Sequence, residues 1–170
     1  MQLVLIALSI GVGMTSSLQI AMLGAINRDR GSLEASWISM LASVSGMALL
    51  LFVAASLGNR PRLPTPFATP WLFAGMGVLL VGALVMAARG LPFYLAATGL
   101  LPIPFLLAAA SIAPKIGLGV YLASIIAGQL IGAVALDHIG AFNAAARPLD
   151  PVRVAGVALL LVGVALIRGR

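Results

Sequence analysis

The chain has 170 residues, of which 62% are apolar and only 8% are charged. Soluble domains average about 45–50% apolar and about 25% charged residues. A soluble fold of this length cannot hide so much apolar surface, so the composition predicts a protein that folds in lipid. The absence of cysteine excludes disulfides and thiolate metal sites, and one histidine excludes a histidine cluster. We therefore expect neither a metal site nor a cofactor.

The net charge of +6 raises nucleic acid as a partner, but the spacing of the charges argues against it. The basic residues form no patch and instead lie singly or in pairs between apolar runs. This distribution is typical of loop anchors that face lipid headgroups. The anchors are Arg28, Arg30, Arg60, Arg62, Arg89, Lys115, Arg147, Arg153, Arg168 and Arg170.

Six apolar stretches reach or approach the roughly 20 residues that a spanning helix needs. None alternates as a membrane β-strand does, and backbone in lipid must satisfy its own hydrogen bonds, so we expect helices. The prediction is an all-α, polytopic transmembrane bundle of about five or six spans in a single domain over residues 1–170. Whether the third stretch fully crosses is left open. The stretches are 3–25, 33–57, 71–88, 91–113, 117–136 and 152–167.

The fourth stretch carries Gly99, Pro102 and Pro104 in its interior. Two prolines so close together remove backbone donors, which predicts a kinked or broken helix. Broken helices in transporters often border a solute cavity. Simple packing is the alternative, and the position of the break near the middle of the stretch favours the cavity.

Small residues recur at helical spacing along several stretches. Ser124, Gly128 and Gly132 form a small-xxx-small ladder that predicts close helix packing, as do Gly156 and Gly163. The serine faces of the first two stretches have two possible roles, in packing or in lining a polar cavity. On the second interpretation Ser16, Ser39 and Ser43, together with Pro102, contact the substrate.

Gln129 lies midway along the fifth stretch, and a buried amide there needs a partner. It either bonds a facing helix or binds a solute, with Gln19 as its natural partner or co-ligand. Asp137 and His138 end the same stretch. The simpler interpretation is an interfacial boundary, with Asp137 linked to a loop arginine such as Arg147. The alternative is a protonatable pair that couples proton entry to transport.

The chain offers little for catalysis. It has no nucleophile beside a base, no pair of carboxylates and no phosphate-binding glycine loop. We therefore expect no enzyme and no ATP-driven pump. A secondary transporter of small organic solutes fits best. A non-transporting membrane subunit that uses the small-residue faces to bind other helices is the alternative.

Basic residues in flanking loops orient membrane proteins, but here they balance. With six spans, five basic residues fall on each side of the membrane, and the balance is the same if 71–88 does not cross. This pattern predicts a protein that inserts both ways and pairs with itself antiparallel, or one that is oriented by a paired homologue. Transporters built from two inverted halves have the same architecture.

The run Gly128-Gln129-Leu130 followed by Asp137-His138-Ile139-Gly140-Ala141-Phe142 resembles the signature of the small YdcZ-like group in the drug/metabolite transporter (DMT) superfamily. Ala113–Gly117 resembles the turn before the same helix of that group. Gln19, Asn27, the 35–46 stretch and the 153–163 stretch are similar to its other helices. The resemblance implies a DMT-like half-transporter in the bacterial inner membrane. Members are usually described with five helices, which leaves 71–88 without a counterpart.

Overall fold

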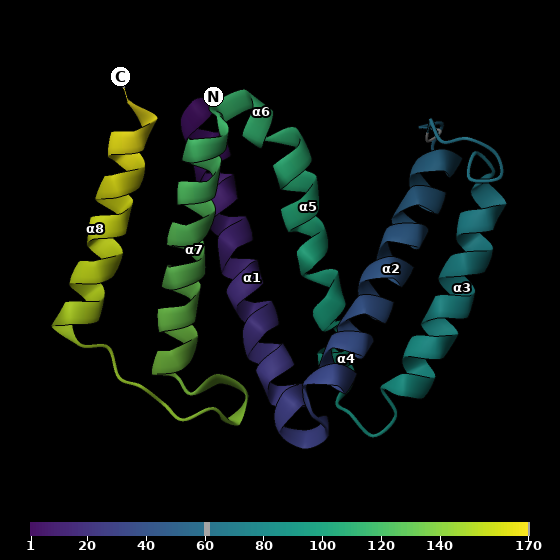
Figure 1. Cartoon of the computed structure of the whole chain (residues 1–170), viewed down its shortest axis with the longest axis horizontal. Helices are drawn as coiled ribbons and strands as arrows, with labels where there is room; N and C mark the ends of the chain where they lie inside the picture. The colour runs from purple at the N-terminus through teal and green to yellow at the C-terminus, as the bar shows by residue number, and fades with distance from the viewer. Residues whose placement is uncertain (60–61, 170) are drawn as a thin grey trace. The chain divides into compact units, whose positions relative to one another are not determined.

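The computed structural model describes residues 1–59 and 62–169, so the anchors Arg60 and Arg170 lie outside the described part. In that part helices are the only regular structure, and six are long and apolar enough to cross a membrane (Figure 1). The all-α, polytopic fold predicted from the sequence is therefore confirmed. The six are α1 (Gln2–Arg30), α2 (Ser32–Ser56), α3 (Pro70–Ala87), the interrupted Phe93–Ser111, α7 (Leu118–His138) and α8 (Pro151–Arg168).

The helix ends follow backbone geometry more than polarity. The sequence predicted that α1 would stop near residue 25, yet the helix continues through the polar run 27–30. A polar residue can lie outside the lipid and still belong to the helix. The break comes at Gly31, whose φ of 85° only glycine adopts readily. Gly117, with a φ of 87°, separates the short helix α6 (Ala113–Ile116) from α7 in the same way.

The fourth stretch is broken, as its prolines predicted. It consists of α4 (Phe93–Ala96), the 3₁₀ segment η1 (Ala97–Leu100) and α5 (Pro102–Ser111). Pro102 has no N–H to offer the carbonyl of Thr98, and that carbonyl instead accepts from Leu101 at 3.3 Å. Pro102 then opens α5, a position where the missing donor costs nothing.

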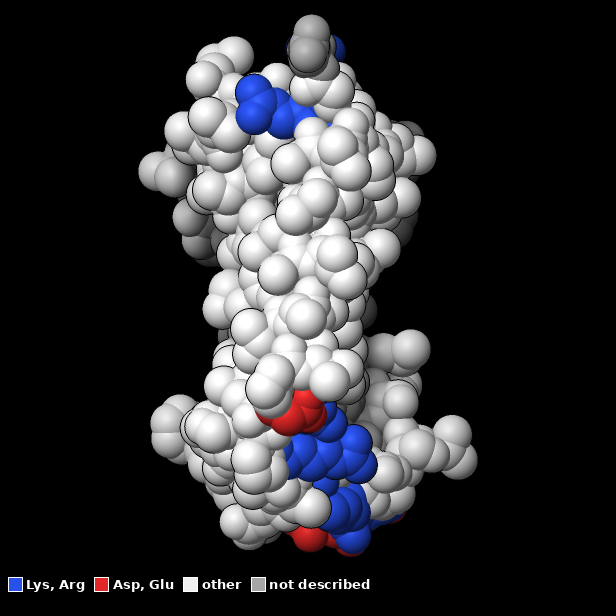
Figure 2. Space-filling model, turned by 90° about the vertical axis from the view of Figure 1, so that its left-hand side faces the viewer, with Lys and Arg blue, Asp and Glu red and all other residues white. Residues whose placement is uncertain are grey.

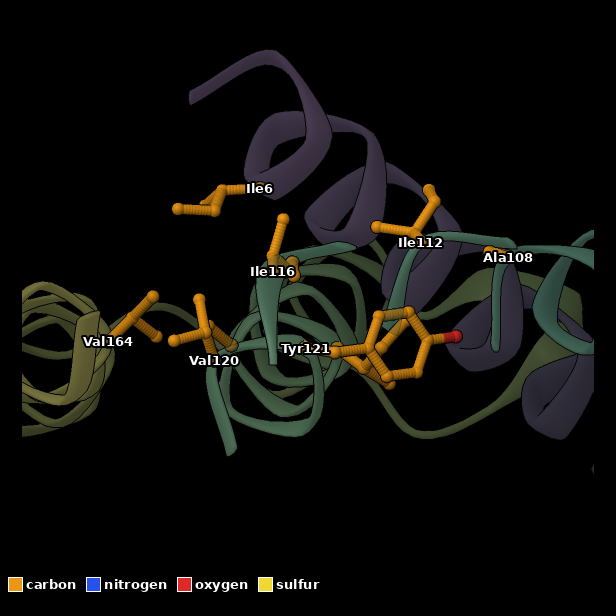
Figure 3. Close-up of a cluster of buried hydrophobic side chains, with 9 residues drawn as sticks. Ile6, Ala108, Ile112, Ile116, Val120, Tyr121 and Val164 are labelled. Carbon is orange, nitrogen blue, oxygen red and sulfur yellow. The ribbon is translucent and has the colours of Figure 1, made fainter. Parts of the chain in front are cut away.

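The chain divides into two compact units, and the single domain expected from the sequence stays a prediction. Unit 1 comprises Met1–Ala25 and Pro104–Arg170. Its core gathers apolar side chains from α1, α5, α6, α7 and α8 (Figure 3), where Tyr121 is 1% exposed. Gly156 and Gly163 of α8 have no atom of the described residues within 4 Å of an added side-chain carbon. No described helix therefore packs on these two glycines, and helix packing at this face stays a prediction.

Unit 2 comprises Ile26–Ile103 and is built on the antiparallel pair α2 and α3. The two helices approach closely where Gly77 of α3 meets the side chain of Leu49. Farther toward the end where α2 stops and α3 begins, the rings of Phe52 and Trp71 lie 5.8 Å apart. The stretch 71–88 is therefore a full 18-residue helix beside α2, long enough to span.

Arg30 fastens the last turn of α1 to the last turn of α3 inside unit 2. Its guanidinium donates to the main-chain oxygen of Ala87 at 2.8 Å and also to that of Arg89. The final carbonyls of a helix have no partners within the helix, and a cation beside them is favourable. A residue that the sequence offered only as a loop anchor thus caps a neighbouring helix.

Charged side chains mark the ends of the helices in unit 1. Figure 2 looks onto the side that carries α8, where charged residues gather toward the two ends and the band between them has none. Arg153 and Arg168 are the basic residues of α8, one in its first turn and one at its end. This spacing suits a helix whose long basic side chains reach headgroups at both surfaces.

Candidate functional site

Two serine hydroxyls of the predicted polar face on α1 find acceptors within their own helix. Ser16 is buried and donates to the main-chain oxygen of Val12 at 3.3 Å, and Ser9 donates to that of Leu5 at 2.8 Å. Such back-bonding gives the hydroxyl hydrogen an acceptor without another helix. Ser16, expected as a substrate contact, is thus placed as a small buried residue whose hydroxyl already has an acceptor.

The tightest helix crossing of unit 1 joins α1 to α7, which run in the same direction (Figure 1). A methyl group on Gly13 would overlap the main-chain oxygen of Ile125, and one on Gly128 would overlap that of Ile10. At Gly132 the added carbon would lie 3.0 Å from the Cβ of Ser17. Small residues let helix backbones touch in lipid, where apolar surface alone gives little attraction. The Ser124–Gly128–Gly132 ladder lies along this contact, with Ser124 fully buried.

Gln129 belongs to the same crossing through its backbone. Its main-chain oxygen accepts from Ser17 Oγ at 2.5 Å. This bond engages the backbone and leaves the half-buried side-chain amide for other partners. Gln19 lies half-buried on α1, two positions beyond Ser17. The structure thus places Gln129 at the glycine-lined crossing, whereas Gln19 lies about 200° around the α1 axis from Ser17.

The second close contact lies in unit 2, where α2 meets the broken helix. Ser43 Oγ donates to the main-chain oxygen of Gly99 at 2.7 Å and lies 2.9 Å from that of Ser39. Gly99 is buried, and an added methyl group would overlap the oxygen of Ser39 and lie 2.7 Å from Ala42 Cβ. Three residues predicted as substrate contacts, Ser39, Ser43 and Pro102, therefore surround one break in the helical ladder.

A groove of about 260 Å³ adjoins this break, between α2, α3 and the α4–η1 segment. Its walls are apolar apart from Ser45, whose hydroxyl bonds the main-chain oxygen of Ala42 at 3.1 Å. The sequence favoured a cavity beside this break, but it did not predict the apolar residues of α3, α4 and η1 that line the groove. The lining residues are Ala42, Ser45, Gly46, Leu49, Val81, Leu84, Phe93, Ala96, Ala97 and Leu100.

Asp137 and His138 close the hairpin between α7 and α8. Asp137 pairs with Arg153, the oxygen-to-nitrogen distance being 3.6 Å, and its main-chain oxygen accepts from the N–H of Arg147 at 2.8 Å. His138 Nδ1 accepts from the N–H of Leu149 at 3.2 Å. The suggested link from Asp137 to the Arg147 side chain is therefore corrected, because Arg147 binds here through its backbone and Arg153 supplies the charge.

The two groups of predicted polar residues on α7 do not form one site. Asp137 lies eight positions beyond Gln129, which is about 12 Å along a helix axis. Asp137 and His138 meet the loop and the first turn of α8, whereas Gln129 meets α1.

Comparison with known proteins gives one match. The family model described as "Putative inner membrane exporter, YdcZ" matches residues 67–166. No curated protein and no solved structure matches the chain. The matched range contains α3 (Pro70–Ala87), so the expectation that this helix has no counterpart in the family is wrong. The similarity inferred for the first two helices lies outside the matched range and stays a prediction.

Proposed function

This chain belongs to the YdcZ family of inner-membrane exporters, and on that premise we propose a secondary transporter of small organic solutes that acts as a dimer. The protein is an integral, multi-pass protein of the inner membrane. No phosphate-binding loop occurs in its sequence, so we propose that a gradient and not ATP drives the transport. We propose a transporter and not an enzyme.

The observation that carries the proposal is the broken helix beside the groove in unit 2. Non-helical backbone at membrane depth is tolerated only where protein buries it or where it borders a cavity. Here both conditions are met, because Ser43 bonds the carbonyl of Gly99 and a groove of about 260 Å³ lies alongside. The groove beside the break is what favours a solute site over simple packing.

The lining of the groove narrows the class of solute. Nine of its ten lining residues have no side-chain polar group, and the tenth, Ser45, already bonds its own helix. The groove therefore suits an uncharged apolar or aromatic portion of a small molecule. Ser39, Ser43 and Pro102 hold the wall in place. On unit 1 we propose that Gln129, together with Gln19 and Ser16 of α1, contacts a polar portion of the solute.

Balanced loop charges and open helix faces support the dimer. Gly75 and Gly82 of α3, like Gly156 and Gly163 of α8, have no described atom within 4 Å of an added carbon. Faces of small residues allow another helix to approach. The same faces support the second candidate function, a non-transporting subunit that binds other membrane proteins.

A flux measurement with one groove-filling variant tests the proposal. The full chain is reconstituted in proteoliposomes and assayed against a panel of labelled small organic solutes, with protein-free liposomes as the blank. We expect uptake of at least one solute by the wild type and its loss in Ala97→Phe, which fills the groove. Leu107→Phe, at an α5 position that is 53% exposed, is the matched control and should transport normally.

Two results would count against this function. If no solute in the panel moves faster than in protein-free liposomes, the result favours a non-transporting subunit over a transporter. If Ala97→Phe and Leu107→Phe transport equally well, the groove is not on the solute path even where flux exists.

A further inference from the structure

A second apolar groove lies within unit 1, between α7 and α8, with a volume of about 390 Å³. Every residue that lines it is aliphatic. Along α8 the lining runs from Val154 to Leu161, about 10 Å of helix length. Such a groove has no side-chain group that could hydrogen-bond a polar solute. Its aliphatic walls can instead pack along an acyl chain. The lining residues are Ile131, Val134, Ala135, Leu149, Val154, Val157, Ala158 and Leu161.

One end of this groove lies among charges of both signs. Two lining residues, Leu149 and Val154, directly adjoin Asp150 and Arg153 in the chain. Arg153 lies 3.6 Å from a carboxylate oxygen of Asp137 and 3.6 Å from one of Asp150. Together with the exposed Arg147, the group has two carboxylates and two guanidiniums and is electrically balanced.

The ion pairs among these residues leave some of their charged groups able to bind a further partner. The side chains of Asp137 and Asp150 are 46% and 51% exposed. Arg153 meets both oxygens of Asp150, one through its guanidinium and one through its backbone N–H at 2.9 Å, but only one oxygen of Asp137. The backbone N–H of Arg147 donates to the main-chain oxygen of Asp137, so the exposed Arg147 side chain begins beside Asp137. The carboxylate of Asp137 can therefore accept from a primary ammonium while Arg147 contacts a phosphate.

We propose that this groove holds one acyl chain of a membrane phospholipid whose headgroup carries both a phosphate and a primary ammonium, the chemistry of phosphatidylethanolamine. The aliphatic walls match the chain, and the balanced charges match a zwitterionic headgroup. The depth also matches, since α8 begins at Pro151 and Arg153 lies in its first turn, at the level where basic side chains meet headgroups. An anionic headgroup without an ammonium brings no donor to the second carboxylate oxygen of Asp137 and adds negative charge beside it.

The test is lipid retention by the full chain, measured by native mass spectrometry from mild detergent. The protein is titrated with phosphatidylethanolamine, phosphatidylcholine and phosphatidylglycerol of identical acyl chains. We expect one phosphatidylethanolamine to be retained about tenfold more strongly than either of the others, as one charge-assisted hydrogen bond predicts. A quaternary ammonium cannot donate that bond, and phosphatidylglycerol has no ammonium.

Matched variants locate the site. Ala158→Trp fills the groove and should abolish the preference, whereas Leu159→Trp, at the neighbouring position that is 71% exposed, should keep it. Asp137→Asn should reduce the preference for phosphatidylethanolamine about tenfold, and Asp29→Asn, far along the chain from this groove, should not. The lipid comparison on the wild type needs no variant, so the headgroup preference is still measured if Ala158→Trp misfolds.

Three outcomes would overturn the inference. Equal retention of all three lipids removes the headgroup selectivity. Unchanged selectivity in Ala158→Trp places the lipid elsewhere. A change of oligomer mass in Ala158→Trp without a change in lipid retention shows that a second copy of the chain occupies the groove. None of these results bears on solute flux, so the proposed transport function stands or falls separately.

Discussion

The hydroxyl group of Ser43 donates to the main-chain oxygen of Gly99 across 2.7 Å, and this bond joins α2 to the one described segment where a spanning stretch loses its α-helical ladder. Pro102 has no N–H to complete that ladder, and a serine from another helix supplies a donor close by. The same combination of a glycine contact and a serine-to-carbonyl bond occurs in unit 1 between Ser17 and Gln129.

Replacing Ser43 with alanine tests the junction. We expect Ser43→Ala to lower the free energy of unfolding by about 1 kcal/mol, because the Gly99 carbonyl loses its donor away from water. Unfolding in mixed micelles measures the change. Ser56→Ala is the control, since Ser56 is exposed and donates only to its own helix. Equal stability of the two variants would show that the carbonyl finds another donor.

Adding one methyl group distinguishes a glycine that touches another helix from a glycine with no described neighbour. We expect Gly128→Ala to destabilise the fold by about 1–3 kcal/mol, because the methyl group overlaps the backbone of Ile10. Gly156→Ala is chemically the same change at a position with no described neighbour, and it should raise the free energy of unfolding by up to about 1 kcal/mol, because alanine favours the helix more than glycine does. If Gly128→Ala is tolerated as well, α1 and α7 do not cross this closely.

Arg30 is expected to stabilise α3 through its carbonyl contacts. We expect Arg30→Gln to cost about 1 kcal/mol of unfolding free energy, because the last turn of α3 loses both a cation and its donors. Arg89→Gln removes an equal charge from an exposed side chain and should cost less. Urea or detergent unfolding of both variants makes the comparison. A larger loss in Arg89→Gln would refute the capping role.

Proton coupling through Asp137 and His138 has a direct test. We expect Asp137→Asn to keep its solute flux and its proton dependence, because both residues are engaged in closing the α7–α8 hairpin. Flux is measured in proteoliposomes with and without an imposed proton gradient, once a transported solute is known. Loss of proton-linked flux with retained downhill flux would instead assign the coupling role to this pair.

Topology reporters test the balanced charges. With five basic residues on each side, we expect fusions at the carboxyl end to report both locations in one culture. Adding two lysines after residue 59 should bias the population to one orientation, and adding them after Arg89 should bias it to the other. A single strict orientation of the unaltered chain would exclude an antiparallel homodimer.

Much of the fold follows from the sequence because lipid imposes it. Each apolar stretch must satisfy its own backbone, and the sequence has no alternating pattern, so the helices and the break near Pro102 were predictable. The end of α1 was predicted too early, since Asn27 and its polar neighbours mark the membrane surface and Gly31 ends the helix. Polarity locates the edge of lipid, and backbone conformation locates the edge of a helix.

The sequence by itself determined the solvent, the secondary structure and the family resemblance of this protein, because apolar length, proline positions and a short signature are all local. Only the tertiary structure decided that Gly13, Gly99 and Gly128 touch a backbone while Gly156 and Gly163 touch nothing described. It also decided that Ser17 and Ser43 reach another helix while Ser16 bonds its own. The physical reason is that lipid is as apolar as the helices it surrounds, so hydrophobicity does not distinguish the faces that pack from the faces that meet the membrane.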